Sequence, residues 1–180
     1  MPIVSVVFIG SMGKHGSSVL FGVLFGISVY AGPVPPDCFD SKRRLLQVSN
    51  RQVIEWREST PNQFQSRALV QGVITQIYPE KTGHAHFALN LDADPAGDIE
   101  IIYNQNFGEL PALKSGMQVA ACGDYITAGP KSRLPSPMGA IIHWVHYNPG
   151  DRDGGVHPHG YLMINGTVYG FSSKLPRNDF

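Results

Sequence analysis

The sequence lacks a charge excess of either sign, because its 14 Lys and Arg residues are matched by 14 Asp and Glu residues. Proteins that bind nucleic acid through its phosphates need a basic surface, so composition gives no charge-based reason to expect a nucleic-acid partner. The sequence also lacks a G-x-S-x-G nucleophile elbow, a P-loop and a dinucleotide fingerprint. It has no internal repeat and no low-complexity tract. The 180 residues therefore predict one modest domain after any targeting segment is removed.

No hydrophobic run reaches the roughly 20 apolar residues that a transmembrane helix needs. The apolar stretch Val19–Ala31 follows Lys14 and ends in small residues before a Pro-rich segment. This layout is typical of a secretory signal peptide. We therefore expect residues 1–31 to be a signal peptide, with no stable membrane span after cleavage and a periplasmic or secreted mature protein. A membrane anchor is the alternative, and Met12 is an alternative start.

The sequence has only two cysteines, Cys38 and Cys122, and both lie in the expected mature chain. In an oxidising compartment two such thiols can pair. Alternation along residues 117–126 places Val119 and Tyr125 on one face of a strand and Cys122 on the other. Cys122 would then point away from the core, where an N-terminal helix could bring Cys38 to it. The sequence leaves open a disulfide or two free, partly buried thiols.

Residues 32–62 are expected to form a leader ahead of the main domain. The first of them, GPVPPD, are too rich in proline for a helix. Residues 40–60 place apolar side chains at roughly helical intervals after Asp40 or Ser41, either of which can cap a helix. The pattern predicts a helix over residues 40–60, with Asn50 as a point where it could divide into two.

Residues 63–180 have the alternating apolar pattern of a β domain. We expect five strands and a C-terminal hairpin, at residues 66–79, 84–92, 99–106, 117–128, 140–148 and 161–171. Three strands, a connector with little helix and two more strands is the order of an OB-fold. The sequence therefore predicts a mainly β protein, a small five-stranded OB-like Greek-key barrel with an N-terminal helical segment and a C-terminal hairpin. An open β-sandwich is the alternative. Gly72 within the first strand predicts a bulge or bend, and Asn165-Gly166 predicts the hairpin turn.

Six of the seven histidines fall in the expected β domain. On its second strand, strict alternation turns Phe87, Leu89 and Leu91 towards the core. His84 and His86 then share the opposite face, roughly 6–7 Å apart at Cα. Two imidazoles in that arrangement can point at one ligand.

Further histidines follow in the fifth strand and in the loop after it. His143 and His146 are three residues apart, so a regular strand would put them on opposite faces. They converge only if the strand ends or bulges near Val145. His157, beside Pro158, lies in a loop that can fold over either pair. The alternative is a set of loop histidines that are hydrogen-bonded to backbone.

Four imidazole nitrogens satisfy Zn²⁺, and three with a water make an open catalytic site. The candidate ligands for zinc or another divalent transition metal are His84, His86, His143, His146 and His157. In a metal-dependent hydrolase built on these residues, Asp151 or Asp153 would be the general base.

Three stretches, beginning VQGVITQIYP, IIYNQNFGEL and GAIIHWVHYNP, together resemble the bacterial family called domain of unknown function 3465. The resemblance covers Ala68 to Tyr169, and its most specific family positions fall on His143, Trp144, His146 and Pro149. Further family positions fall on His84 or His86, on Asn104, and on His157 or His159, whereas Tyr103 and Tyr147 stand where the family often has histidine. The resemblance implies a small exported OB-like domain and no established activity.

These observations favour an exported binding module for an unknown small-molecule or polymeric ligand. The expected ligand contacts are His143, His146, Trp144, Asn104 and Tyr103, with Trp144 as a stacking or packing ring and Asn104 as a polar anchor. A histidine-ligated metal hydrolase is the first alternative. The second is binding of single-stranded nucleic acid or an oligosaccharide on the barrel face. Residues 32–180 keep 13 of the basic and all 14 acidic residues, a formal charge of −1 that argues against nucleic acid, as does export.

Overall fold

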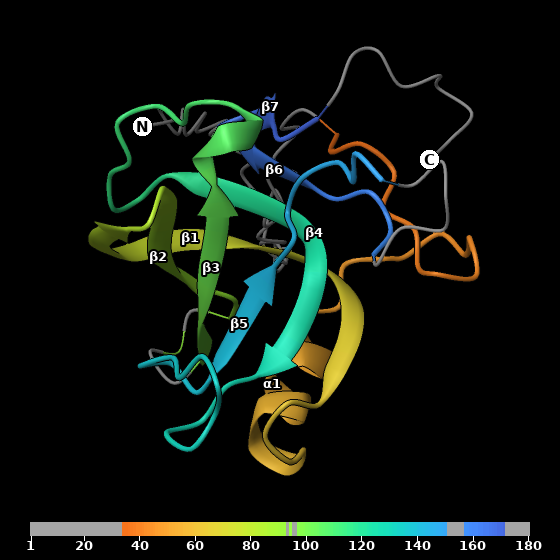
Figure 1. The fold of residues 1–180 in the computed structure, drawn as a ribbon, viewed down its shortest axis with the longest axis vertical. Helices are drawn as coiled ribbons and strands as arrows, with labels where there is room; N and C mark the ends of the chain where they lie inside the picture. The colour runs from red at the N-terminus through yellow and green to blue at the C-terminus, as the bar shows by residue number, and fades with distance from the viewer. Residues whose placement is uncertain (1–33, 93, 95–96, 151–156, 172–180) are drawn as a thin grey trace, which may run out of the picture. The chain divides into compact units, whose positions relative to one another are not determined.

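The computed structural model describes residues 34–92, 94, 97–150 and 157–171, and within these ranges the protein is mainly β (Figure 1). The expected signal peptide, residues 1–31, lies outside the described residues. In the part of the chain that the structure describes, no helix is both long enough and apolar enough to cross a membrane.

Seven strands of the described ranges form one sheet. They are β1 (Gln65–Lys81), β2 (His84–Asn90), β3 (Asp98–Asn104), β4 (Gln118–Thr127), β5 (Ala140–His143), β6 (Tyr161–Ile164) and β7 (Thr167–Tyr169). Their order in the sheet is β1-β2-β3-β5-β4-β6-β7, and β1 also pairs with β4. All neighbours are antiparallel except β3 and β5, which run parallel.

Strands β1 to β5 pair in the succession β1-β2-β3-β5-β4, and β4 pairs again with β1, but these pairings differ greatly in length. β1 pairs with β4 continuously from Gln65 to Val73. In contrast, β3 and β5 pair only at Glu100 with Ile141 and at Ile101 with Ile142. The sheet is therefore not an evenly closed barrel, although its curvature brings β1 back against β4 (Figure 1).

Gly72 lies where β1 passes from one partner strand to another. Before it β1 pairs with β4, and from Val73 onwards β1 pairs with β2. A Cβ atom at Gly72 would lie 2.0 Å from the carbonyl oxygen of Asn90, closer than any side chain could tolerate. The register of β1 against β2 also shifts between Ile74 and Gln76. The strand therefore has an irregularity of the predicted kind, although the shift in register falls just after Gly72 rather than at it.

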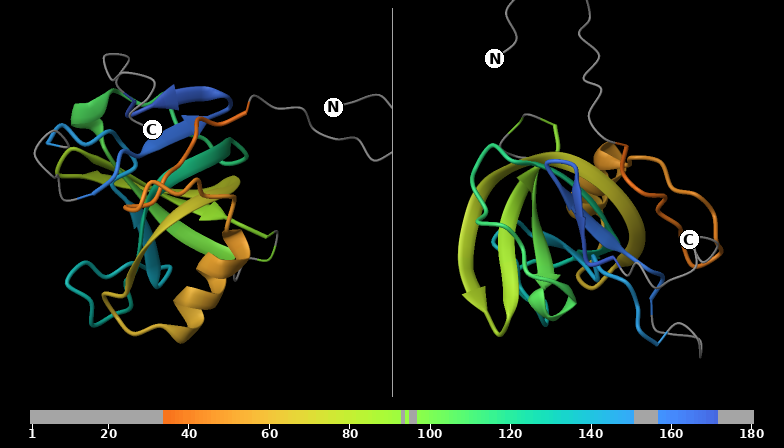
Figure 2. Two further views of the ribbon diagram at one scale, coloured as in Figure 1. Left: turned by 90° about the vertical axis from the view of Figure 1, so that its right-hand side faces the viewer. Right: turned by 90° about the horizontal axis from the view of Figure 1, so that it is seen from above.

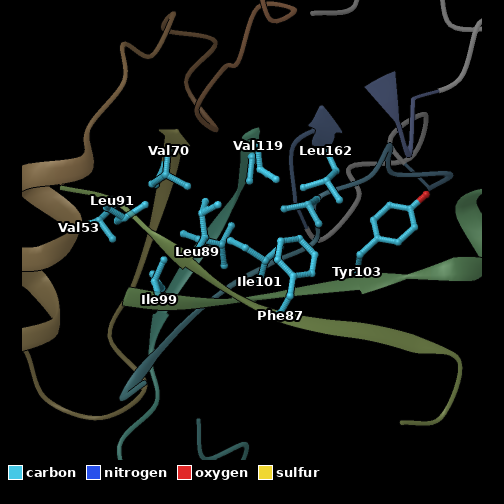
Figure 3. Close-up of a cluster of buried hydrophobic side chains, with 14 of the residues drawn as sticks. Val53, Val70, Phe87, Leu89, Leu91, Ile99, Ile101, Tyr103, Val119 and Leu162 are labelled. Carbon is cyan, nitrogen blue, oxygen red and sulfur yellow. The ribbon is translucent and has the colours of Figure 1, made fainter. Parts of the chain in front are cut away.

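Alternate residues of neighbouring strands fill one hydrophobic core (Figure 3). Phe87, Leu89 and Leu91 all lie in it, as the alternation of the second strand predicts. From β3 the core receives Ile101 and Tyr103, and Tyr103 is drawn at one end of the labelled row in Figure 3. Because these residues face inward, the residues between them face the other side of the sheet.

The helix is shorter than predicted and covers one end of the sheet. Helix α1 spans Asn50–Ser59 and packs Val53 into the core (Figures 2 and 3). The prediction of helix from residue 40 is wrong, because the Asp40 carboxylate accepts the backbone N–H groups of Lys42 and Arg44 and closes a turn instead. Side chains of this residue type commonly compete with helix in this way.

Cys38 and Cys122 form a disulfide that spans 84 residues of sequence. Both side chains are buried, and Cys122 lies on the face of β4 opposite Tyr125, as alternation predicts. Cys38 comes from the extended segment before α1, however, so the expectation that a helix carries it is wrong. Structural disulfides persist mainly in oxidising compartments, so this bond is consistent with a protein outside the cytoplasm.

The last two strands form the predicted hairpin. β6 and β7 pair antiparallel, with Ile164 opposite Thr167. The turn residues Asn165 and Gly166 have φ angles of 46° and 87°, the left-handed conformation that Asn-Gly turns adopt. The predicted turn is confirmed.

Candidate functional site

The strand registers bring histidines from distant parts of the chain to the outward face of the sheet. On β2, His84 and His86 lie opposite Asn104 and Ile102 of β3. β5 runs parallel to β3, with Ile142 opposite Ile101, and ends at the next residue, His143. The face is the one turned away from the main core, as the sequence predicts for His84 and His86.

Six aromatic rings are linked by successive ring contacts that start on this face and end at Phe107, which packs against the main core. They are called the histidine cluster: His84, Phe107, His143, Trp144, His146 and His157. The His84 and His143 ring centroids lie 6.2 Å apart, and His143 lies 4.6 Å from the Trp144 ring. The rings of Trp144 and His157, and those of His157 and His146, are each 5.5 Å apart. His143 and His157 therefore lie beside the indole as expected, whereas His86 pairs with Glu100. The role of these histidines in binding stays a prediction.

The histidine cluster forms because β5 ends at His143, whereas the sequence predicted a strand that continues to residue 148. The strand stops at His143, and Trp144 has a φ of 51°, in the left-handed region that bulky residues rarely occupy. This backbone turn removes the strict alternation that would separate His143 from His146. A residue held in such a conformation costs on the order of 1–3 kcal/mol and depends on its surroundings to hold it there.

Packing around Trp144 supplies those surroundings. Its ring packs against the buried group Ile102, Ile126, Ala128 and Ile141. Its backbone is approached by Gly160, where a Cβ atom would lie 2.3 Å from the Trp144 carbonyl oxygen. Trp144 therefore serves as a packing ring that fixes the imidazoles on either side of it.

Three cluster histidines are held through Nδ1 by backbone carbonyls. His84 Nδ1 lies 2.9 Å from the Thr82 oxygen, and His146 Nδ1 lies 2.7 Å from the Tyr147 oxygen. His157 Nδ1 lies 2.9 Å from the Pro158 oxygen. A carbonyl oxygen can only accept, so each Nδ1 carries the proton. In the uncharged imidazole, Nε2 then keeps a lone pair.

Those Nε2 atoms have no hydrogen-bond partner within the described part of the chain. These Nε2 atoms are acceptors of the same kind, and those of His146 and His157 belong to side chains that are largely buried. Such atoms can accept hydrogen bonds from hydroxyl or N–H groups, or coordinate a metal ion.

Burial keeps three of the cluster histidines, His143, His146 and His157, uncharged at neutral pH. Burial, followed by repulsion from the neighbouring imidazole of His84, lowers the pKa of His143 to about 4. Burial also lowers the pKa of His146 to about 4, against the hydrogen bond to Tyr147, which favours the charged form. Burial likewise lowers the pKa of His157. At neutral pH these rings are therefore neutral acceptors.

A buried ion pair fixes the loop that carries His157. Arg67 donates to Asp124 at 2.8 Å and to the backbone oxygens of Phe39 and His159. Only 6% of the Arg67 side chain is exposed, and burial lowers its pKa while Asp124 opposes that shift. Asp124 lies opposite His143 in the β4–β5 register. The Arg67 guanidinium therefore links three parts of the chain: the segment that contains Phe39, strand β4 and the segment that contains His159.

Some predicted contacts lie elsewhere. Tyr103 is fully buried in the core, and burial raises the pKa of its phenol to about 12. The Asn104 side chain accepts the backbone N–H of Asn106 and caps the short 3-10 helix Gln105–Phe107, which is turn chemistry. His86 pairs through Nδ1 with Glu100 at 2.8 Å.

Two neighbours of the predicted residues were not expected in these roles. Phe107 stacks flat on His146, with centroids 3.6 Å apart. Glu100 lies beneath His86, and alternation within IEIIYN could have placed it on the same outward face. No sequence signal places Phe107, which belongs to an irregular connector.

The structure does not assemble the predicted zinc site. Among the described residues, no group of three or more His, Cys, Asp or Glu side chains is placed to hold a metal ion. The rings pack on one another rather than converging: His146 is stacked on Phe107 and stands at 87° to His157. The candidate bases Asp151 and Asp153 lie outside the described residues.

No model of a known protein family matches this chain, and no curated protein has significant similarity to it. The resemblance to domain of unknown function 3465 therefore stays a prediction.

Proposed function

We propose that this protein is an exported, OB-like binding module whose histidine cluster binds a neutral, hydroxyl-bearing ligand, with sugars as the first class to test. Export is supported by the buried disulfide between Cys38 and Cys122. The OB-like assignment is supported by the sequence of pairings β1-β2-β3-β5-β4 and the return of β1 to β4.

The observation that carries the proposal is the set of neutral imidazoles with anchored Nδ1 atoms. His146 and His157, whose pKa values burial lowers, each use Nδ1 on a carbonyl and retain an Nε2 lone pair. Nδ1 of His84 is held by the Thr82 oxygen. A ligand that matches them must supply hydrogen-bond donors. Hydroxyl groups do so without bringing charge into the cluster.

The electrostatics favour a neutral ligand. The environment that depresses the pKa of His143 and His146 also penalises any other charge that loses its water there. Arg67 is already paired with Asp124, and Glu100 is hydrogen-bonded to Nδ1 of His86.

The test is a titration of the purified protein with maltose, cellobiose and N,N′-diacetylchitobiose, followed by calorimetry and by the Trp144 indole N–H signal. We expect at least one disaccharide to bind with a Kd of about 1 mM or tighter. His146→Asn keeps a donor near the Tyr147 oxygen but removes Nε2, and should weaken binding about 2- to 10-fold, the value of one hydrogen bond.

Glu55→Gln on α1, whose side chain is 51% exposed, is the matched control and should leave binding unchanged. Failure of all three sugars, together with stoichiometric binding of Zn²⁺ or Ni²⁺ that His146→Asn abolishes, would show instead that the cluster is a metal site. Equal sugar affinity in both variants would place the binding surface elsewhere.

A further inference from the structure

A separate hollow of about 190 Å³ lies between the end of the β1–β2 hairpin and the connector that follows β3. Its apolar walls are Ile77, Ala85, Leu110, Pro111 and Leu113. Ile77 is 43% exposed and contributes apolar surface to the lining of the pocket. None of the rings of the histidine cluster lines this pocket.

The polar groups of the pocket offer acceptors. Gln105 donates its amide N–H to Glu80 Oε2 at 2.7 Å, which leaves the amide oxygen of Gln105 and the second carboxylate oxygen of Glu80. His86 lines the pocket with its Nδ1 held 2.8 Å from Oε1 of Glu100. A ligand that satisfies these atoms must bring hydrogen-bond donors.

The charges around the pocket are negative. Glu80 lines it, and Glu100 lies behind His86. Burial, then the nearby Glu100 and Asp98 carboxylates, raise the pKa of the Tyr78 phenol, so this lining residue stays uncharged. No Lys or Arg is among the described residues that line the pocket.

We propose that this pocket binds a small primary ammonium ion with an apolar body of about six carbons. The Glu80 carboxylate pairs with the ammonium group, whose N–H donors also match Gln105. The hydrocarbon body covers Ile77, Leu110 and Leu113. At the packing density of protein interiors, the volume holds roughly seven or eight non-hydrogen atoms. This site is independent of the sugar-binding proposal.

The experiment is an NMR titration of the full chain with n-hexylammonium chloride, with 1-hexanol and hexanoate as probes of equal length. We expect shifts confined to the amides of residues 77–86 and 105–113, with hexylammonium bound at least about fivefold more tightly than hexanol and hexanoate not bound. Glu80→Gln keeps an oxygen for Gln105 but removes the charge, and should weaken hexylammonium at least about fivefold.

Two further variants complete the test. Glu58→Gln removes an exposed carboxylate from α1 and should leave the hexylammonium affinity unchanged. Ala85→Leu should fill the pocket and abolish the shifts, with the spectrum of the fold retained. Binding of hexanoate as tight as that of hexylammonium, an unchanged affinity in Glu80→Gln, or shifts away from the pocket would each overturn the proposal.

Discussion

Lowering the pH from 7 to 4 will destabilise the protein by about 3 kcal/mol through His146 alone, with a smaller additional loss through the partly exposed His143. The folded-state pKa of each ring, about 4, lies below the value of 6.5 expected for the unfolded chain. Between these values the unfolded state binds more protons. The contribution of these two rings to stability is therefore level above about pH 6.5 and falls as the pH drops towards 4.

The measurement is the free energy of unfolding from urea titrations at several values of pH. His146→Asn should remove its share of the slope between pH 6.5 and 4, because the substituted side chain does not titrate. Glu55→Gln on α1 should leave the slope as it is. A wild-type stability that does not change over this interval would contradict the description of His146 as a buried neutral ring.

Replacing both cysteines by serine will lower the free energy of unfolding by at least about 4–5 kcal/mol. The bond between Cys38 and Cys122 closes a loop spanning 84 residues, and the chain-entropy account of cross-links gives this value for a loop of that size. Both side chains are buried, so the two hydroxyl groups add a desolvation cost of their own.

The check compares urea unfolding of the oxidised wild type, the reduced wild type and the double variant. Reduction alone separates the loss of the cross-link from the cost of buried hydroxyls. Ser66→Ala is the control. Ser66 lies on β1 where that strand pairs with β4, but it takes no part in the disulfide, so its replacement should change stability little. A reduced protein as stable as the oxidised one would show that the bond does not restrain the unfolded chain.

The strands were predictable because alternation reports burial directly. In HAHFALNLD the apolar positions identify the core face, and His84 and His86 follow onto the other face. The Asn165-Gly166 turn was predictable because few residues other than Asn and Gly adopt positive φ easily. These signals are local and need no knowledge of the rest of the chain.

The remaining features depend on contacts between distant segments. The left-handed Trp144 is held by packing on β3 and β4 residues and by the approach of Gly160. Arg67 meets partners 57 and 92 residues further along the chain. No local sequence pattern indicates contacts between such distant residues. The predicted fifth strand was therefore too long, and the ion pair between Arg67 and Asp124 was not predicted.

The central claim is that the cluster presents neutral imidazoles protonated on Nδ1. A long-range ¹H–¹⁵N spectrum of protein labelled at histidine reports the protonation of both ring nitrogens. At pH 7 we expect His146 and His157 with a proton on Nδ1 and a bare Nε2, with His146 still uncharged at pH 5. Rings charged at pH 7, or protonated on Nε2 instead, would contradict the account.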